Sequence, residues 1–117
     1  MTIEVHRIYD GPAAPAGKRV LVDRLWPRGI RSDAGLIDEW IKEVAPSNEL
    51  RQWYGHDPAK WEEFRHRYFT ELEDQPEAVE RLLAHARGGD LILLYSSKER
   101  ALNNAVALRE YLQARLG

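Results

Sequence analysis

Residues 19–31 read Arg19-Val20-Leu21-Val22-Asp23-Arg24-Leu25-Trp26-Pro27-Arg28-Gly29-Ile30-Arg31, and we expect the rest of the chain to be arranged around this stretch. Its opening is a short β-branched apolar run, which predicts a buried strand. Pro27 and Gly29 then break the strand and turn the chain. Because α/β sheets bind ligands at the carboxyl ends of their strands, we expect the polar residues of this turn to face a ligand site.

The same stretch concentrates positive charge. Residues 18–31 hold five lysine and arginine residues against Asp23 alone, a net charge of +4 in a chain whose net charge is −2. Two interpretations of the arginines are open: they form surface ion pairs with carboxylates of this chain, or they bind a ligand. A basic island on an acidic body favours a small anionic ligand, and we do not expect a nucleic-acid duplex as a partner.

Length and composition set the broad class. A chain of 117 residues with 44% hydrophobic residues predicts a single domain over residues 1–117. The absence of cysteine excludes disulfides, thiolate nucleophiles and cysteine metal sites. No apolar run is long enough to cross a bilayer, and the N-terminus lacks the apolar stretch of a signal peptide, so we expect a cytoplasmic protein without a membrane partner.

Two further strands flank the arginine stretch in sequence. Residues Ile3 to Tyr9 alternate loosely and predict a first strand, in which His6 is expected to be hydrogen-bonded rather than a ligand. The continuous apolar run Leu91 to Tyr95 is typical of a central parallel strand covered on both faces. The Pro/Gly loop at residues 10–17 is either a connector or a cover for the site.

Helical spacing predicts the other elements. The first helix is expected after an N-cap at Ser32 or Asp33, with an apolar stripe of Leu36, Ile37, Trp40, Ile41 and Val44. The sequence predicts four more helices: a short one capped by Ser47 and ended by Gly55, one opened by Asp57-Pro58 and running to Glu73, one from Pro76 to Gly88-Gly89, and one over residues 101–115.

This order predicts an α/β fold, with a small mainly parallel sheet of three or more strands and helices packed on it. The helical segment between the second strand and the third is long enough for a right-handed parallel crossover. The connection between the first strand and the second is short, and the pairing of the first strand stays open.

Parallel pairing of residues 20–22 with residues 91–94 would bring both carboxyl ends to one edge of the sheet. Ser96 and Ser97 would then precede a helix N-terminus, where backbone amides attract anions, beside Arg24, Arg28 and Arg31. The two serines are either ordinary helix caps or ligand-binding groups. Asparagine is a poor residue in a helix interior, so Asn103 and Asn104 indicate a cap or a site.

Candidate catalytic groups are Asp23, His56 and Tyr95. Asp23 is expected chiefly to orient Arg24 or Arg28, with a role as general base as the alternative. His56 lies in a compact polar turn and is either an acid–base group or a turn residue that packs beside Trp53. Asp57 is expected to cap its helix. A metal site formed by His56 and Asp57 is weakly supported, because no third ligand follows at a useful spacing.

Three motifs resemble those of one known family: Val20-Leu-Val-Asp-Arg-Leu-Trp-Pro-Arg-Gly29, Trp53-Tyr-Gly-His-Asp-Pro58, and Leu93-Leu-Tyr-Ser96 followed by Asn103-Asn-Ala-Val106. Together they resemble the YeaO-like branch of the domain-of-unknown-function family 488, over nearly the whole chain. The resemblance implies a fold and no reaction. Relatives in another branch carry cysteine at the position of Tyr95 and Cys-His-Arg near Asn103, so their thiol chemistry does not transfer to this chain.

Two classes of function follow. The first is a domain that binds a small phosphate- or carboxylate-bearing ligand, with catalysis on a nucleotide-like substrate left open. The second is a non-catalytic interaction or regulatory module that docks an acidic partner through its arginine turn. No cofactor is expected, because the sequence has no Gly-rich phosphate loop and no dinucleotide fingerprint.

Overall fold

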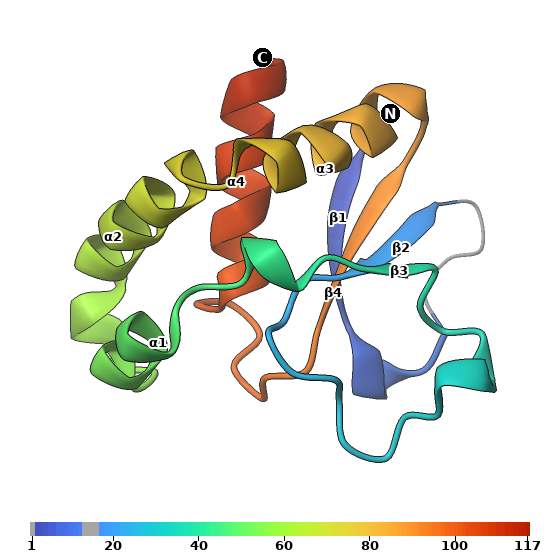
Figure 1. Ribbon diagram of the computed structural model, residues 1–117. Helices are drawn as coiled ribbons and strands as arrows, with labels where there is room; N and C mark the ends of the chain where they lie inside the picture. The colour runs from blue at the N-terminus through green and yellow to red at the C-terminus, as the bar shows by residue number, and fades with distance from the viewer. Residues whose placement is uncertain (1, 13–16) are drawn as a thin grey trace.

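The computed structural model describes residues 2–12 and 17–117, which form a four-stranded sheet with four α-helices (Figure 1). The strands are β1 (Ile3–Arg7), β2 (Lys18–Leu21), β3 (Glu39–Trp40) and β4 (Leu91–Tyr95). The helices are α1 (Asn48–Tyr54), α2 (Trp61–Glu73), α3 (Pro76–Gly88) and α4 (Asn104–Leu116), with 3₁₀ turns at Ile8–Asp10, Ser32–Ala34, Lys42–Val44 and Pro58–Lys60. The predicted α/β class is confirmed.

All strand pairings in the sheet are parallel, and the strand order is β1-β4-β2-β3. β4 is central: Leu93 lies opposite Val5 of β1 on one side and opposite Val20 of β2 on the other. The predicted parallel pairing of the second strand with the apolar run is therefore confirmed. The first strand, whose partner the sequence left open, pairs with β4.

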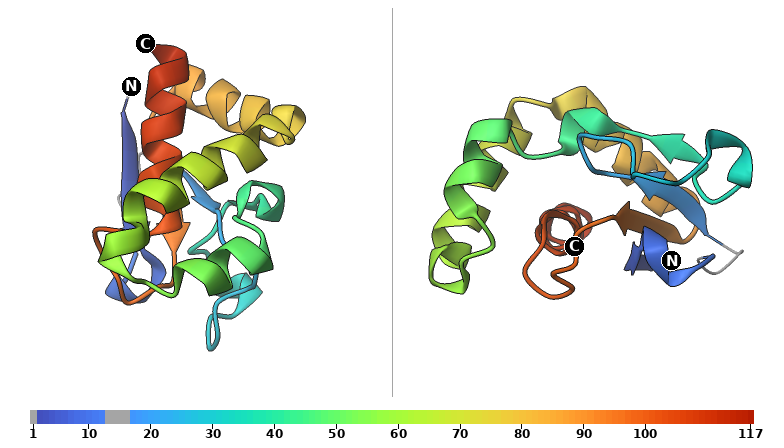
Figure 2. Two further views of the ribbon diagram at one scale, coloured as in Figure 1. Left: turned by 90° about the vertical axis from the view of Figure 1, so that its left-hand side faces the viewer. Right: turned by 90° about the horizontal axis from the view of Figure 1, so that it is seen from below.

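The two faces of β4 belong to different hydrophobic clusters, because successive side chains of a strand point to opposite faces. Leu91, Leu93 and Tyr95 belong to a core cluster built with all four α-helices, and Figure 2 shows α1, α2 and α4 on one side of the strands. Ile92 and Leu94 belong to a second cluster, which is covered by side chains of a non-helical segment. These covering side chains are Trp26, Ile30, Leu36, Ile37 and Trp40.

The helix predicted over residues 32–44 is wrong. This segment contains a 3₁₀ turn, the short strand β3 and a second 3₁₀ turn. Tertiary pairing overrides its helical spacing, because the Asp38 amide donates to the Arg19 carbonyl (2.8 Å) and the Ile41 amide donates to the Leu21 carbonyl (3.0 Å). Trp40 and Ile41 then pack in different core clusters, as neighbours in an extended chain do.

The other predicted helices form. Ser47 caps α1, accepting a hydrogen bond from the Leu50 amide (3.1 Å), and Gly55 ends the helix at φ +54°. Asp57 caps the turn that Pro58 opens and accepts from the Ala59 amide (3.0 Å). The last helix begins at Asn104 rather than at residue 101, because the Asn103 side chain caps it by accepting from the Val106 amide.

Three further sequence predictions concern His6, the Pro/Gly loop and membrane-spanning segments. His6 is hydrogen-bonded as predicted, through Nε2 and the Gly11 carbonyl (2.9 Å). The question of whether the Pro/Gly loop covers the site falls on residues 13–16, outside the described residues. No helix formed by the residues that the structure describes is long and apolar enough to cross a membrane.

Trp26 fixes the arginine turn to the sheet. Its indole Nε1 donates to the Ile30 carbonyl (2.6 Å), and its ring meets Trp40 edge-to-face with centroids 5.6 Å apart. The Trp40 indole in turn donates to the Asp23 carbonyl (2.8 Å). The two tryptophans therefore hold the turn at both ends.

Trp26→Ala should lower the free energy of unfolding by about 2–4 kcal/mol, since it removes a half-buried aromatic side chain and its hydrogen bond. Leu25→Ala is the matched control: this neighbouring side chain is 64% exposed, and its loss should change stability by at most about 0.5 kcal/mol. Urea unfolding measures both variants, and equal midpoints for them would contradict the role assigned to Trp26.

Candidate functional site

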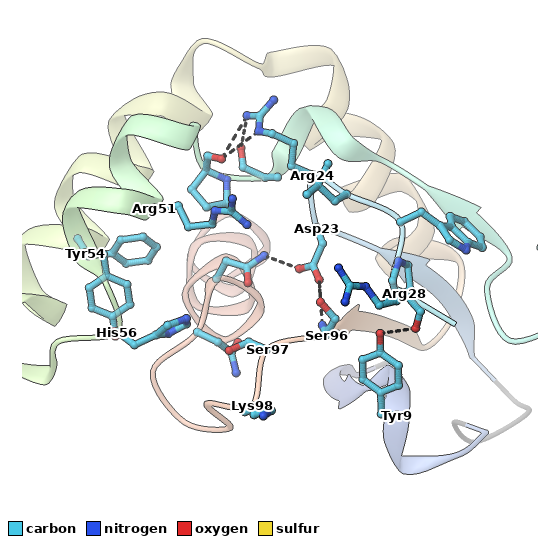
Figure 3. Close-up of a pocket in the computed structure, with 18 residues that line it drawn as sticks. Tyr9, Asp23, Arg24, Arg28, Arg51, Tyr54, His56, Ser96, Ser97 and Lys98 are labelled. Atoms are coloured by element: carbon cyan, nitrogen blue, oxygen red, sulfur yellow. Dashed lines mark hydrogen bonds between the residues drawn. The ribbon is translucent and has the colours of Figure 1, made fainter. Parts of the chain in front are cut away.

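A pocket of about 590 Å³ lies at the carboxyl ends of β2 and β4 (Figure 3). Its walls come from the arginine turn after β2, the loop between β4 and α4, and α1 with the turn that follows it. This is the sheet edge at which the sequence placed the site. Eight of the predicted site residues line it: Asp23, Arg24, Arg28, His56, Ser96, Ser97, Asn103 and Asn104.

Two predicted site residues lie elsewhere. The Arg31 side chain is 82% exposed and pairs with Asp33 (3.0 Å), which is the surface ion pair that the sequence offered as its alternative. Tyr95 is 3% exposed and belongs to the core cluster on the helix side of the sheet. Burial raises the pKa of the Tyr95 hydroxyl, which makes this group a poorer proton donor or acceptor near neutral pH.

Asp23 joins the two strand ends. One carboxylate oxygen accepts from the backbone amide (2.9 Å) and the hydroxyl (2.8 Å) of Ser96, and the other accepts from the Asn104 side-chain amide (3.2 Å). The sequence expected Asp23 to orient Arg24 or Arg28, and the structure directs its bonds to Ser96 and Asn104 instead. Figure 3 shows this bonded group at the centre of the pocket.

Amides of the loop between β4 and α4 also donate to oxygens of the chain itself. The Glu99 carboxylate accepts from the amides of Ala101 (2.7 Å) and Leu102 (3.0 Å), and the Ser97 hydroxyl accepts from the Glu99 amide (3.1 Å). The Leu102 and Ala101 amides lower the pKa of Glu99. The Glu99 carboxylate, which belongs to the chain itself, therefore accepts hydrogen bonds from backbone amides in the loop where the sequence predicted that amides would bind an external anion.

Side-chain cations gather around the pocket instead. Arg24, Arg28, Arg51 and Lys98 line it, against Asp23 as the one acidic residue among the described lining residues. Arg28, Arg51 and Lys98 have exposed side chains, and no carboxylate within residues 2–12 and 17–117 forms an ion pair with them. Their charge is available to an anion.

Arg24 differs from the other three cations. Its guanidinium donates to the carbonyls of Pro46 (3.2 Å) and Ala45 (3.4 Å). It also lines a second pocket of about 260 Å³, together with three acidic residues: Glu43, Glu71 and Asp74. Arg24 thus lies between the two pockets and connects the arginine turn to the start of α1.

Sequence reasoning missed Arg51 and Lys98. Arg51 lies on α1, where only the apolar and capping residues were interpreted, although its position three residues before Tyr54 places both on one face of the helix. Lys98 follows Ser97 in the loop after the central strand, which is the segment that the sequence did single out. The described residues contain no group of three or more His, Cys, Asp or Glu placed to hold a metal ion.

Asp23→Asn should lower the free energy of unfolding by about 1–3 kcal/mol, because the new amide directs N–H donors at the Ser96 or Asn104 donors. Ser96→Ala removes only one hydroxyl bond and should cost about 1 kcal/mol. Denaturant unfolding of the two variants measures both values. Equal stability of Asp23→Asn and wild type would show that the carboxylate does not connect the strand ends.

The hydrogen bonds that the Glu99 carboxylate accepts from the Ala101 and Leu102 amides should make the stability of the fold depend on pH. Because the folded-state pKa of Glu99 is lowered, its stabilisation is complete above the unfolded-state pKa and is lost as pH falls through the folded-state value. The difference in melting temperature between wild type and Glu99→Gln should therefore be largest near pH 7 and shrink toward pH 3. A difference of equal size at pH 7 and pH 3 would contradict the role assigned to the Glu99 carboxylate.

Comparison with known proteins places the chain in a family. Residues 2–117 match the family model DUF488-N3i, described as "Inactive DUF488-N3 subclade". The chain is 40% identical to the "Uncharacterized protein YeaO" of Escherichia coli (strain K12) over 114 residues, covering 97% of this chain and 99% of that protein. It is 39% identical over 114 residues to the "Uncharacterized protein Rv3073c" of Mycobacterium tuberculosis (strain ATCC 25618 / H37Rv), covering 97% and 95%.

No solved structure shows a significant match to this chain. The family model covers nearly every residue, and so do the relatives. The resemblance that the sequence motifs indicated is therefore confirmed. The chain belongs to the DUF488 family, as a YeaO-like member that matches the subclade described as inactive DUF488-N3.

Proposed function

We propose that the pocket at the ends of β2 and β4 binds a small organic anion that carries a phosphate or carboxylate group, and that it does so in the cytoplasm. The observation that carries this proposal is the charge of the lining. Three exposed cations, Arg28, Arg51 and Lys98, line the pocket, and Asp23, the one acidic residue among the lining residues that the structure describes, already accepts three hydrogen bonds.

Electrostatics favours such a ligand. Like charges around one cavity repel each other, and an anion bound between them relieves that repulsion. Arginine adds geometric selectivity, because its planar fork of N–H donors matches phosphate and carboxylate groups with two parallel hydrogen bonds. Figure 3 shows Arg28 and Arg51 on opposite sides of the pocket. The charges of both would attract an anion in the space between them.

The volume of the pocket indicates a ligand larger than a bare ion. Small-molecule sites commonly enclose about 300–1,000 Å³, and this pocket encloses about 590 Å³. An inorganic phosphate would fill only a small part of it. We therefore propose that the anionic group is attached to an organic body.

Binding is favoured over catalysis. Asp23 is engaged by Ser96 and Asn104, and Tyr95 is buried, so two of the three predicted catalytic groups do not offer a free acid or base to the pocket. The description of the matching subclade as inactive agrees with this interpretation. His56 lines the pocket with an exposed side chain, and we assign it to recognition.

A second candidate function has one observation in its favour. Leu25 is 64% exposed, and it lines the pocket from the same turn as Arg28. An exposed leucine in one turn with an arginine that has no ion pair among the described residues is also suited to an acidic protein segment with an apolar side chain. The experiment below distinguishes this partner from a small molecule.

The test is a calorimetric titration of the protein with AMP and with adenosine, which differ only in the phosphate group, and with citrate as a carboxylate. We expect AMP or citrate to bind and adenosine to bind at least tenfold more weakly than AMP. Arg28→Ala and Arg51→Ala should each weaken anion binding by roughly tenfold or more, the loss of a charged hydrogen bond. Added salt should weaken it further.

Arg31→Ala is the matched control, because this arginine lies in the same turn but outside the pocket lining and pairs with Asp33. It should leave the affinity unchanged. An equal loss in Arg31→Ala and Arg28→Ala would contradict the pocket as the binding site. If neither anion binds while a synthetic acidic peptide does, the second candidate function replaces the first.

A further inference from the structure

A continuous row of aromatic rings leads from the pocket into the core. Successive ring centroids lie 5.8 Å apart from His56 to Tyr54, 4.4 Å from Tyr54 to Phe64 and 5.7 Å from Phe64 to Tyr68. These separations are typical of paired aromatic side chains, which prefer offset or tilted contacts at such distances. The row continues beyond Tyr68 through Phe69 to Tyr111 on α4.

The pocket end of this row is open to solvent. His56, Tyr54 and Phe64 all line the pocket, and Tyr54 and Phe64 are buried whereas His56 is exposed. The Tyr54 hydroxyl donates to the Leu102 carbonyl (2.7 Å), which fixes the second ring. The row therefore ends in an accessible ring that is supported from behind by immobilised rings.

The backbone at this end is unusual. His56 has φ +57° and is the one non-glycine residue with positive φ within residues 2–12 and 17–117. The left-handed region is unfavourable for a residue with a Cβ, although asparagine, aspartate and histidine tolerate it better than most. A glycine would adopt this conformation freely, so the imidazole is retained at some cost in backbone energy. Such positions cluster at functional sites.

One structural element supplies both a cation and a ring to the pocket. Arg51 and Tyr54 lie three residues apart on α1 and so share a helix face, and His56 follows directly after the helix. Figure 3 shows Arg51, Tyr54 and His56 together on one side of the pocket, with Arg28 and Tyr9 on the other. A ligand held at Arg51 would bring its neighbouring atoms against the aromatic wall.

We infer that the ligand of this pocket is an aromatic or heteroaromatic anion, whose ring packs against the exposed His56 ring, which Tyr54 supports from behind, while its acidic group binds the cations. This inference rests on the proposed anion-binding function and specifies the organic body of the ligand. A planar ring extends the existing row by one more offset contact, which an aliphatic group of equal size does not.

The test uses three monoester phosphates that present the same acidic group: phenyl, cyclohexyl and methyl phosphate. Dissociation constants come from NMR titrations of the isotopically labelled protein. Wild type should bind phenyl phosphate roughly threefold to tenfold more tightly than cyclohexyl phosphate, the range expected for an aromatic pair. Methyl phosphate should bind most weakly.

His56→Asn removes the ring and keeps a residue that tolerates positive φ, so the fold should persist. The ratio of phenyl to cyclohexyl affinity should fall close to one in this variant. At about pH 8, well above the second phosphate pKa, all three ligands are dianions, so any change in local charge acts on all three and leaves that ratio unaffected. His66→Asn, an exposed histidine of α2 outside the pocket lining, should retain the wild-type ratio.

The outcomes separate the two proposals. If no phosphate binds, and AMP and citrate also fail to bind, the anion-binding function itself is wrong. If all three phosphates bind wild type equally, or if His56→Asn retains the preference for the phenyl ester, the pocket binds anions but the aromatic inference is overturned. His56→Gly, which relieves the backbone entirely, serves as a second ring-deleting variant should His56→Asn unfold.

Discussion

The carboxylate of Asp23 is the interaction on which the architecture of the site depends. It connects the end of β2 to Ser96 at the end of β4, 73 residues away in sequence, and to Asn104 at the start of α4. Parallel pairing brings these ends to one edge of the sheet but does not determine where the chain goes afterwards. Asp23 provides that constraint, since both of its oxygens have a defined partner. Arg28 on one side and the loop with Lys98 on the other are placed accordingly.

The backbone amides and the side-chain cations of this region differ in their partners. Backbone amides near α4 donate hydrogen bonds to the chain's own carboxylates: Ser96 donates to Asp23, and Ala101 and Leu102 donate to Glu99. Among the described residues, the cations Arg28, Arg51 and Lys98 have no ion pair. If the pocket binds an anion as proposed, side chains rather than a rigid set of amides would contact it, which suits recognition better than the stabilisation of a transition state.

Local signals were sufficient for much of the fold. The apolar run of β4, the Ser47 cap and the Asp57-Pro58 start each depend on neighbours in sequence, and each prediction is confirmed. The helix prediction for residues 32–44 was wrong because the conformation of this segment depends on residues that are distant in sequence. Its apolar residues are spaced as in a helix, but its conformation is decided by hydrogen bonds to Arg19 and Leu21 of β2, which sequence spacing cannot reveal.

The residues of the candidate site could likewise be predicted only in part. Strand ends could be located from sequence, so Arg28, Ser96 and Asn104 were singled out, and they line one pocket. Arg51 could not, because the position of α1 depends on its packing against α2, a tertiary contact that the sequence does not reveal. The partners of Asp23 were likewise beyond prediction, since a carboxylate near several arginines is expected to bond to them, and the actual choice depends on distances of a few ångströms.

The central position of β4 has a consequence for the energetics of recognition. All five of its side chains are buried, and it is bonded to a neighbouring strand on each side. Ser96, which lines the pocket directly after β4, therefore follows a rigid strand, and a ligand would lose little binding free energy in ordering this part of the wall. Tyr9, Leu25 and Lys98, which also line the pocket, are exposed residues outside the sheet. If the pocket binds a ligand as proposed, exposed side chains above a fixed strand end would let related molecules bind with one common anchoring geometry.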